Sequence, residues 1–210
     1  MSINLKKRIL SSMFLLCCLF FVFKIGKFFF IFLLLALAII SVYELNKLLD
    51  KFYSKLIGAV FLFTSFYTVY EIKFNNINQY LFFLTLSICI FTDMGGFIFG
   101  KLFKGPKLTT ISPNKTISGA IGGLVLSIFF VYLFTIFILE KEFYYQLLIL
   151  TFLLSIVCQI GDLLISYFKR KSNIKDTGNL IPGHGGLLDR IDGMIFAFPF
   201  CFFLSKINFI

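Results

Sequence analysis

Residues 117–139 read ISGAIGGLVLSIFFVYLFTIFIL and contain no charged side chain. A transmembrane helix needs ~20 mostly apolar residues, so this stretch is long enough to cross a bilayer. Similar apolar runs flank it on both sides, at residues 9–23, 28–43, 56–70, 80–100, 145–168 and 194–204. We therefore predict an all-α, polytopic helical membrane protein with seven transmembrane helices, or six if the first two runs are shorter or re-entrant.

The composition of the whole chain agrees with this fold class. Of its 210 residues, 59% are hydrophobic and only 14% are charged. A soluble domain carries about 45–50% apolar and about 25% charged residues. Soluble enzymes, nucleic-acid-binding modules, secreted disulfide scaffolds and disordered tails are therefore excluded.

The basic residues predict the orientation in the membrane. The net charge is +10, and 15 of the 20 Lys and Arg residues fall on one side if the N-terminus lies in the cytosol. Short cytosolic loops are enriched in Lys and Arg, so this bias explains the charge without a nucleic-acid partner. We expect the N-terminus and the loops 101–115 and 169–190 to face the cytosol from the cell (inner) membrane, and the C-terminus to lie outside.

The stretch richest in chemical groups is residues 166–193, SYFKRKSNIKDTGNLIPGHGGLLDRIDG. Basic side chains beside glycines favour phosphate binding, because bare backbone N–H groups can approach an anion that Lys and Arg neutralise. Carboxylates in the same loop suit Mg²⁺, which takes one or two carboxylates plus substrate phosphates. The alternative is a solvated basic loop that only sets topology. The substrate-binding candidates in this stretch are Ser166, Lys169, Arg170, Lys175, Asp176, His184, Gly185, Gly186 and Arg190.

Asp162 is a candidate because of its depth in a predicted helix. It precedes the polar end of that helix by ~9 Å, and an ionised Asp in a spanning helix costs about 2.5–3.5 kcal/mol on insertion scales. Ser166 and Lys169 follow it at i+4 and i+7 on one stripe. We predict that Asp162 and Asp189 jointly hold a metal ion at the mouth of a cytosol-facing polar funnel. The alternative is that Asp162 pairs with Lys169 purely for structure.

A second polar cluster occupies residues 92–122. Asp93 is another acid at membrane depth and is followed by glycines, which permit close helix packing. Ser112 and Lys115 belong to a turn that opens the next span, an arrangement that favours anions. Both are substrate-binding candidates.

Other acidic residues are interpreted as structural. Glu44 and Asp50 flank a cytosolic loop, and we expect them to be solvated or ion-paired. The chain contains none of the G-x-x-x-x-G-K-[ST], G-x-S-x-G or H-E-x-x-H motifs.

The polar stretch resembles the signature of a known family. Its pattern is Ser166-x-x-Lys169-Arg170-x-x-x-x-Lys175-Asp176-x-Gly178, then Pro182-x-His184-Gly185-Gly186-x-x-Asp189-Arg190-x-Asp192. It is similar to the signature of CDP-diacylglycerol synthases (phosphatidate cytidylyltransferases). Upstream segments extend the resemblance: Gln159-x-Gly161-Asp162-Leu163, Thr92-Asp93 with Gly100-Lys101, and Ser112-Pro113-x-Lys115-Thr116 with Gly119. We expect residues 81–210 to form the catalytic transmembrane region, whereas residues 1–80 match by hydropathy alone.

The chain departs from the family pattern at two places. Ile165 stands where the family usually has Glu, and Ile117-Ser118 stands where it usually has Trp-Glu.

The resemblance implies a reaction in which CTP and phosphatidic acid give CDP-diacylglycerol and pyrophosphate, with the lipid tails in the bilayer. It implies Mg²⁺ on Asp162 and Asp189, and a second cation such as K⁺. Lys169, Asp189 and Asp192 would be the catalytic residues, and Lys169, Arg170 and Lys175 would clamp phosphate oxygens. The chain could also form a homodimer, which the resemblance does not decide.

Other functions compete with this interpretation. A CTP-dependent polyprenol or dolichol kinase, or a synthase acting on ether lipids, would keep CTP but change the acceptor. An ion-coupled secondary transporter could use Asp93 and Asp162. Transporters usually place their sites at the midplane between repeated halves, whereas here the polar residues gather at one surface and no repeat is visible. A purely structural membrane protein is the remaining alternative.

Overall fold

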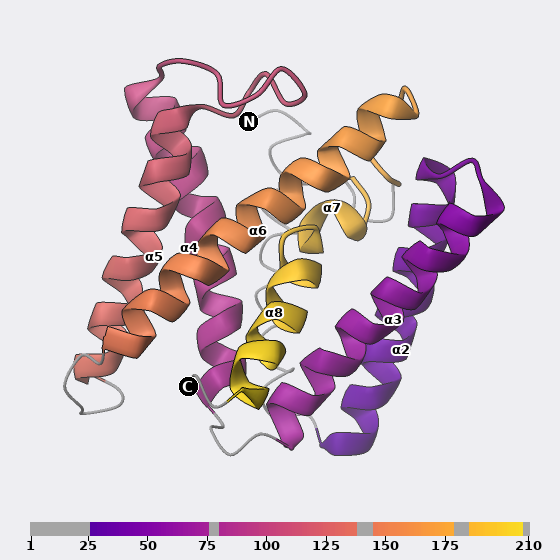
Figure 1. Cartoon of the computed structure of the whole chain (residues 1–210), viewed down its shortest axis with the longest axis horizontal. Coiled ribbons are helices and arrows are strands. Elements are labelled where there is room, and N and C mark those ends of the chain that lie inside the picture. The colour runs from indigo at the N-terminus through magenta and orange to yellow at the C-terminus, as the bar shows by residue number, and fades with distance from the viewer. Residues whose placement is uncertain (1–25, 76–79, 138–144, 179–184, 208–210) are drawn as a thin grey trace, which may run out of the picture. The chain divides into compact units, whose positions relative to one another are not determined.

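The computed structural model describes residues 26–75, 80–137, 145–178 and 185–207 (Figure 1). All the named elements in these ranges are helices, and an isolated antiparallel bridge joins Lys107 to Thr116. The helices are α2 (Lys27–Leu48), α3 (Phe52–Phe74), α4 (Tyr80–Phe103), α5 (Ile117–Phe137), α6 (Tyr145–Lys171), α7 (Leu188–Ile191) and α8 (Met194–Lys206). The prediction of an all-α fold is confirmed.

Five of these helices, α2 to α6, are long and apolar enough to cross a membrane. Large apolar side chains such as Phe32, Ile57 and Phe97 are exposed on them, as expected for surfaces that face lipid. The protein is therefore a polytopic helical membrane protein. The first predicted span, residues 9–23, lies outside the described residues. The last, α8, has 13 residues and is ~20 Å long, which is less than the ~30 Å hydrocarbon core.

The chain divides into two compact units. The first comprises Met1–Phe66 and Phe168–Ile191, and its described part contains α2, most of α3, the end of α6 and α7. The second comprises Tyr67–Tyr167 and Asp192–Ile210, and contains α4, α5, most of α6 and α8. The polar residues of the signature are thus divided between two bodies, each with its own packing.

In the second unit, α4 and α5 pack through glycines, and Figure 1 shows them side by side. A Cβ atom on Gly95 would lie 2.6 Å from the carbonyl oxygen of Gly122, and one on Gly119 would lie 2.7 Å from that of Gly96. The two backbones therefore touch directly, as small residues allow in membrane helices. The packing expected from the glycines of the second cluster is present.

Polar side chains also join the helices of the second unit. The Thr92 hydroxyl donates to Ser155 Oγ at 2.9 Å, which joins α4 to α6. The Gln159 amide donates to the carbonyl of Ala120 at 3.2 Å, which joins α6 to α5. Hydrogen bonds between helices stabilise membrane proteins where no water competes. They hold α6, and with it Asp162, against α4 and α5.

The glycine contact gives a matched pair of test variants. Gly95→Ala should lower the thermal midpoint of the purified protein in detergent, because the added methyl meets backbone, and overpacking costs about 1–3 kcal/mol. Gly96→Ala should leave the midpoint unchanged or raise it, since a Cβ there would meet its nearest atom, the Gly119 carbonyl oxygen, only at 3.8 Å. Equal midpoints for the two variants would contradict the direct backbone contact.

Candidate active site

In the second unit, Lys115 lies in the loop of residues 104–116 that joins α4 to α5, and this loop turns back on itself. Gly105 has a φ of +107°, a left-handed conformation that suits glycine. The two arms of the turn then pair: the Leu108 N–H donates to the Lys115 carbonyl at 2.8 Å, and the Ile117 N–H donates to the Pro106 carbonyl at 3.1 Å. This pairing fixes the backbone that carries Lys115.

The same turn caps the start of α5. The Thr116 hydroxyl oxygen accepts the Gly119 N–H at 3.1 Å, as a helix N-cap does. The Ser112 carbonyl accepts the Lys115 N–H at 3.0 Å. The turn expected at residues 112–116 is therefore present. Ser118, where the family usually has Glu, donates its hydroxyl to the Lys104 carbonyl.

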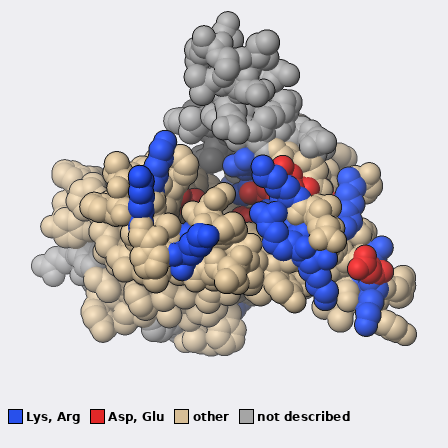
Figure 2. Space-filling model, turned by 90° about the horizontal axis from the view of Figure 1, so that it is seen from above, with Lys and Arg blue, Asp and Glu red and all other residues tan. Residues whose placement is uncertain are grey.

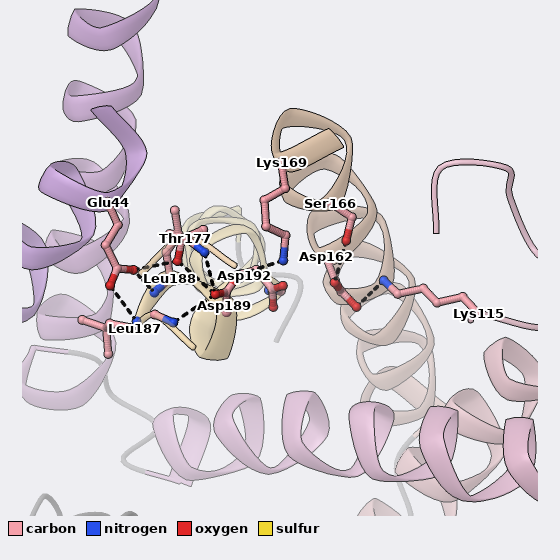
Figure 3. Close-up of polar contacts among 12 residues, drawn as sticks. Glu44, Lys115, Asp162, Ser166, Lys169, Thr177, Leu187, Leu188, Asp189 and Asp192 are labelled. Atoms are coloured by element: carbon pink, nitrogen blue, oxygen red, sulfur yellow. Dashed lines mark hydrogen bonds and ion pairs between the residues drawn. The ribbon is translucent and has the colours of Figure 1, made fainter. Parts of the chain in front are cut away.

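Within the second unit, Asp162 contacts one residue from each of the two polar stretches, Lys115 and Ser166 (Figure 3). Its Oδ2 forms an ion pair with Lys115 Nζ, and its Oδ1 accepts the Ser166 hydroxyl at 3.5 Å. The Lys115 and Asp162 side chains are 28% and 27% exposed, so both can still reach a ligand. Asp162 pairs with Lys115 in the second unit, and Lys169 pairs with Asp189 in the first. The alternative pairing of Asp162 with Lys169 stays a prediction.

Asp189 belongs to the first unit and pairs there with Lys169. Lys169 Nζ donates to Asp189 Oδ1 at 2.8 Å, while Asp189 Oδ2 accepts the backbone N–H groups of Thr177 at 2.8 Å and Gly186 at 3.0 Å (Figure 3). The carboxylate thus holds the loop together with one oxygen and the Lys169 ammonium with the other.

The charge of Asp189 is secured by these contacts. Burial by itself would raise the pKa of the Asp189 carboxyl, but hydrogen bonds from Lys169, Thr177 and Gly186 outweigh it and hold the pKa below its ordinary value. Asp189 is therefore ionised at neutral pH.

The chemistry of this donor set fits Mg²⁺, which prefers carboxylate oxygens. Oδ1 of Asp189 has one donor among the described residues, Lys169, and keeps capacity for a cation. The described residues contain no group of three His, Cys, Asp or Glu side chains that could hold a metal. A metal held by such sparse ligands would complete its coordination with water or substrate oxygens. The joint site of Asp162 and Asp189 stays a prediction.

Gly185 and Gly186 lie so close to neighbouring side chains that a larger residue would not fit at either position. Gly185 has a φ of +85°, and a Cβ there would lie 2.9 Å from Asp189 Oδ2. A Cβ on Gly186 would lie 2.1 Å from Thr177 Oγ1. The glycines predicted to bind substrate therefore also let the chain close around Asp189.

The remaining candidates differ in exposure. Ser166 and Asp192 are buried, and Asp192 Oδ1 accepts the Gly193 N–H at 2.9 Å in the second unit. His184 lies outside the described residues. Ile165, where the family usually has Glu, is buried, which suits its apolar side chain. The candidates on the surface are Arg170, Lys175, Asp176 and Arg190. Figure 2 shows that Lys and Arg side chains outnumber acidic ones on the face viewed there.

Glu44 is the residue that the sequence interpretation missed. The expectation that it is solvated or ion-paired is wrong: it is 2% exposed, and no Lys or Arg among the described residues lies within 4 Å of its carboxylate. It accepts the N–H groups of Leu187 at 3.0 Å and Leu188 at 2.8 Å and the Thr177 hydroxyl at 2.9 Å. The available signal was its position one turn before the end of an apolar helix. Asp50 is exposed, as expected.

The sequence matches a known protein family and is similar to several known proteins. The sequence model described as the cytidylyltransferase family matches residues 49–208. A phosphatidate cytidylyltransferase of Bacillus subtilis is 39% identical over 155 residues, which is 70% of this chain and 56% of that protein. One from Staphylococcus haemolyticus is 47% identical over 51% of this chain and 42% of that protein. One from Rickettsia felis is 41% identical over 71% of this chain and 69% of that protein. The chain thus spans about half the length of the first two relatives.

Proposed function

Because the chain belongs to the cytidylyltransferase family, we propose that it transfers the cytidylyl group of CTP to phosphatidic acid, giving CDP-diacylglycerol and pyrophosphate. The observation that carries the proposal is the contact of Lys169 with Asp189 inside a glycine-lined turn. It supports the proposal because it holds an ammonium group, which can bind phosphate, in a fixed orientation within the segment that the family model matches. The relatives bear the name phosphatidate cytidylyltransferase, which supports the choice of substrates.

The reaction needs neutralisation of negative charge above all. A phosphate oxygen of the lipid attacks the α-phosphorus of CTP, and pyrophosphate leaves in line. Both reactants are polyanions, so fixed cations that face the phosphates lower the barrier. The Lys169 ammonium has three protons, and its hydrogen bond to Asp189 uses one of them. The others can donate to phosphate oxygens from a fixed position.

Lys115 is suited to a similar role in the second unit. Its ammonium is held by Asp162 on a backbone fixed by the paired turn. Arg170 and Lys175, both exposed, would add phosphate contacts from the end of α6 and the following loop. Asp192, two residues before α8 begins, would support the metal or orient Arg190.

Magnesium enters as a proposal based on donor chemistry. Asp162 and Asp189 would supply carboxylate oxygens to Mg²⁺, and the family resemblance adds a second cation such as K⁺. Bound Mg²⁺ would neutralise phosphate charge and stabilise the leaving pyrophosphate.

The function is tested with the full chain in nanodiscs, supplied with phosphatidic acid and CTP labelled at either the α or the γ phosphorus. We expect α label in the lipid product and γ label in pyrophosphate. γ label in the lipid, with polyprenol as acceptor, would instead identify a kinase. Ion uptake into vesicles without lipid product would identify a transporter.

We also propose that the polar loops face the cytosol, on the strength of the Lys and Arg bias. A membrane-impermeant maleimide should label Lys104→Cys and Lys171→Cys only after the cell membrane is opened, whereas Asn75→Cys should be labelled in intact cells. The described native cysteines, Cys89, Cys158 and Cys201, are buried and give little background. Labelling of either loop position in intact cells would contradict the orientation and the access of CTP with it.

A further inference from the structure

Glu44 makes contacts that the family comparison does not assign. It lies before the matched segment, residues 49–208, yet its carboxylate contacts Leu187 and Leu188 within the signature. Each carboxylate oxygen accepts a backbone N–H: Oε1 accepts that of Leu187, and Oε2 accepts that of Leu188 (Figure 3). These groups lie directly before Asp189 in the chain. Glu44 therefore holds the backbone that presents the Asp189 side chain.

The short helix α7 needs such support. It has four residues, Leu188–Ile191, so its first N–H groups have no partner within the helix. A helix this short is not stable by itself, because nucleation is unfavourable. The Glu44 carboxylate, itself supplied by the long helix α2, provides acceptors where α7 begins. The position of α7 is thereby tied to α2.

Thr177 links Glu44 to Asp189. Its hydroxyl lies 2.9 Å from Glu44 Oε2 and 3.1 Å from Asp189 Oδ2, and its backbone N–H donates to the same Asp189 oxygen. The side chain is 1% exposed, so water does not compete. Because one hydroxyl has one proton, Thr177 can satisfy only one carboxylate at a time. The two acids are therefore coupled through it.

Two glycines beside the Glu44 carboxylate leave no space for a larger side chain. A Cβ on Gly186 would lie 2.6 Å from Glu44 Oε2, and one on Gly178 would lie 2.7 Å from Glu44 Oε1. The two glycines thus pack against the carboxylate itself. A loop that fits this closely has little freedom to move while Glu44 is in place.

We propose that Glu44 and Thr177 are positioning residues that fix the segment Gly186–Asp189 and so set the direction of the Asp189 carboxylate. The catalytic consequence of this proposal rests on the proposed function. The structural consequence, an ordered Gly186–Asp189 segment, does not depend on it.

Two matched pairs of variants test the proposal in the full chain in nanodiscs. Glu44→Gln keeps the size of the side chain but turns one acceptor into a donor, and Asp50→Asn is its control at an exposed carboxylate. Thr177→Val removes the hydroxyl, and Thr177→Ser keeps it. We expect Glu44→Gln and Thr177→Val to lower kcat by about 10- to 100-fold, as small misplacements do. The KM for CTP should stay within about twofold, since the lost contacts do not bind substrate. Asp50→Asn and Thr177→Ser should stay near wild type.

Amide hydrogen exchange supplies the readout that is independent of activity. Peptides covering residues 185–191 should exchange faster in Glu44→Gln and Thr177→Val, while peptides of α4 and α5 stay unchanged. Wild-type exchange in both variants would overturn the proposal. So would equally faster exchange in α4 and α5, because the role would then be general stability. If the wild-type protein makes no CDP-diacylglycerol, the proposed function fails, yet the exchange comparison still decides the role of Glu44 and Thr177.

Discussion

Asp162→Asn should lower turnover by at least ~10³-fold, which corresponds to ~4 kcal/mol of transition-state stabilisation. The change removes the negative charge that would hold Mg²⁺ and that orients Lys115, and both effects act on phosphate charge. The measurement is the initial rate of CDP-diacylglycerol formation in nanodiscs over a range of Mg²⁺ concentrations. Asp189→Asn should lose as much.

Protein amount and membrane insertion should be unaffected in both variants, which western blots of washed membranes can check. Asp50→Asn is the matched control, because it removes an exposed carboxylate. Near-normal activity of Asp162→Asn at ordinary Mg²⁺ would assign Asp162 to structure alone, as the partner of Lys115 and Ser166.

Lys169→Ala and Lys175→Ala should each lower kcat/KM by at least ~10²-fold, the loss seen when one fixed transition-state donor is removed. Lys171→Ala should change it little. Lys169 is held by Asp189 and its side chain is 12% exposed, and Lys175 is a specified position of the family signature. Lys171 is exposed, as Lys175 is, but it is not a signature position and it points ~200° away from Lys169 around α6. All three variants should be compared at one ionic strength. Equal losses in all three variants that disappear when the comparison is repeated at high salt would mean that the loop acts as a diffuse electrostatic field, because salt screens exposed charges.

The sequence was sufficient for the fold class because the physical requirement is simple. A bilayer demands long apolar helices, and α2 to α6 coincide with apolar runs that can be read directly. The depth of Asp162 and the repeated glycines beside charged residues were readable for the same reason. Each of these is a property of one short stretch.

Contacts between distant stretches could not be read. Lys115 and Asp162 are 47 residues apart, and Leu188 is 144 residues from Glu44. Both members of the first pair were candidates, but their partnership was not foreseen. Glu44 was assigned to a solvated loop end, although the insertion-cost argument used for Asp162 applies to an acid near the end of α2 as well. Its acceptor role depends on backbone N–H groups, which every residue has and which leave no mark in the sequence.

The glycine contact of α4 with α5 has a consequence for the position of Lys115 along α4. Because the backbones of α4 and α5 touch, the two helices fit together in one register. If α5 moved along α4 by one residue, ~1.5 Å along the axis, a side chain would meet a carbonyl oxygen. Lys115 lies two residues before α5 begins. The contact between the two helices therefore also fixes where the backbone of Lys115 lies along α4. A thicker or thinner lipid layer can tilt this helix pair as one rod, but it cannot raise or lower Lys115 along α4.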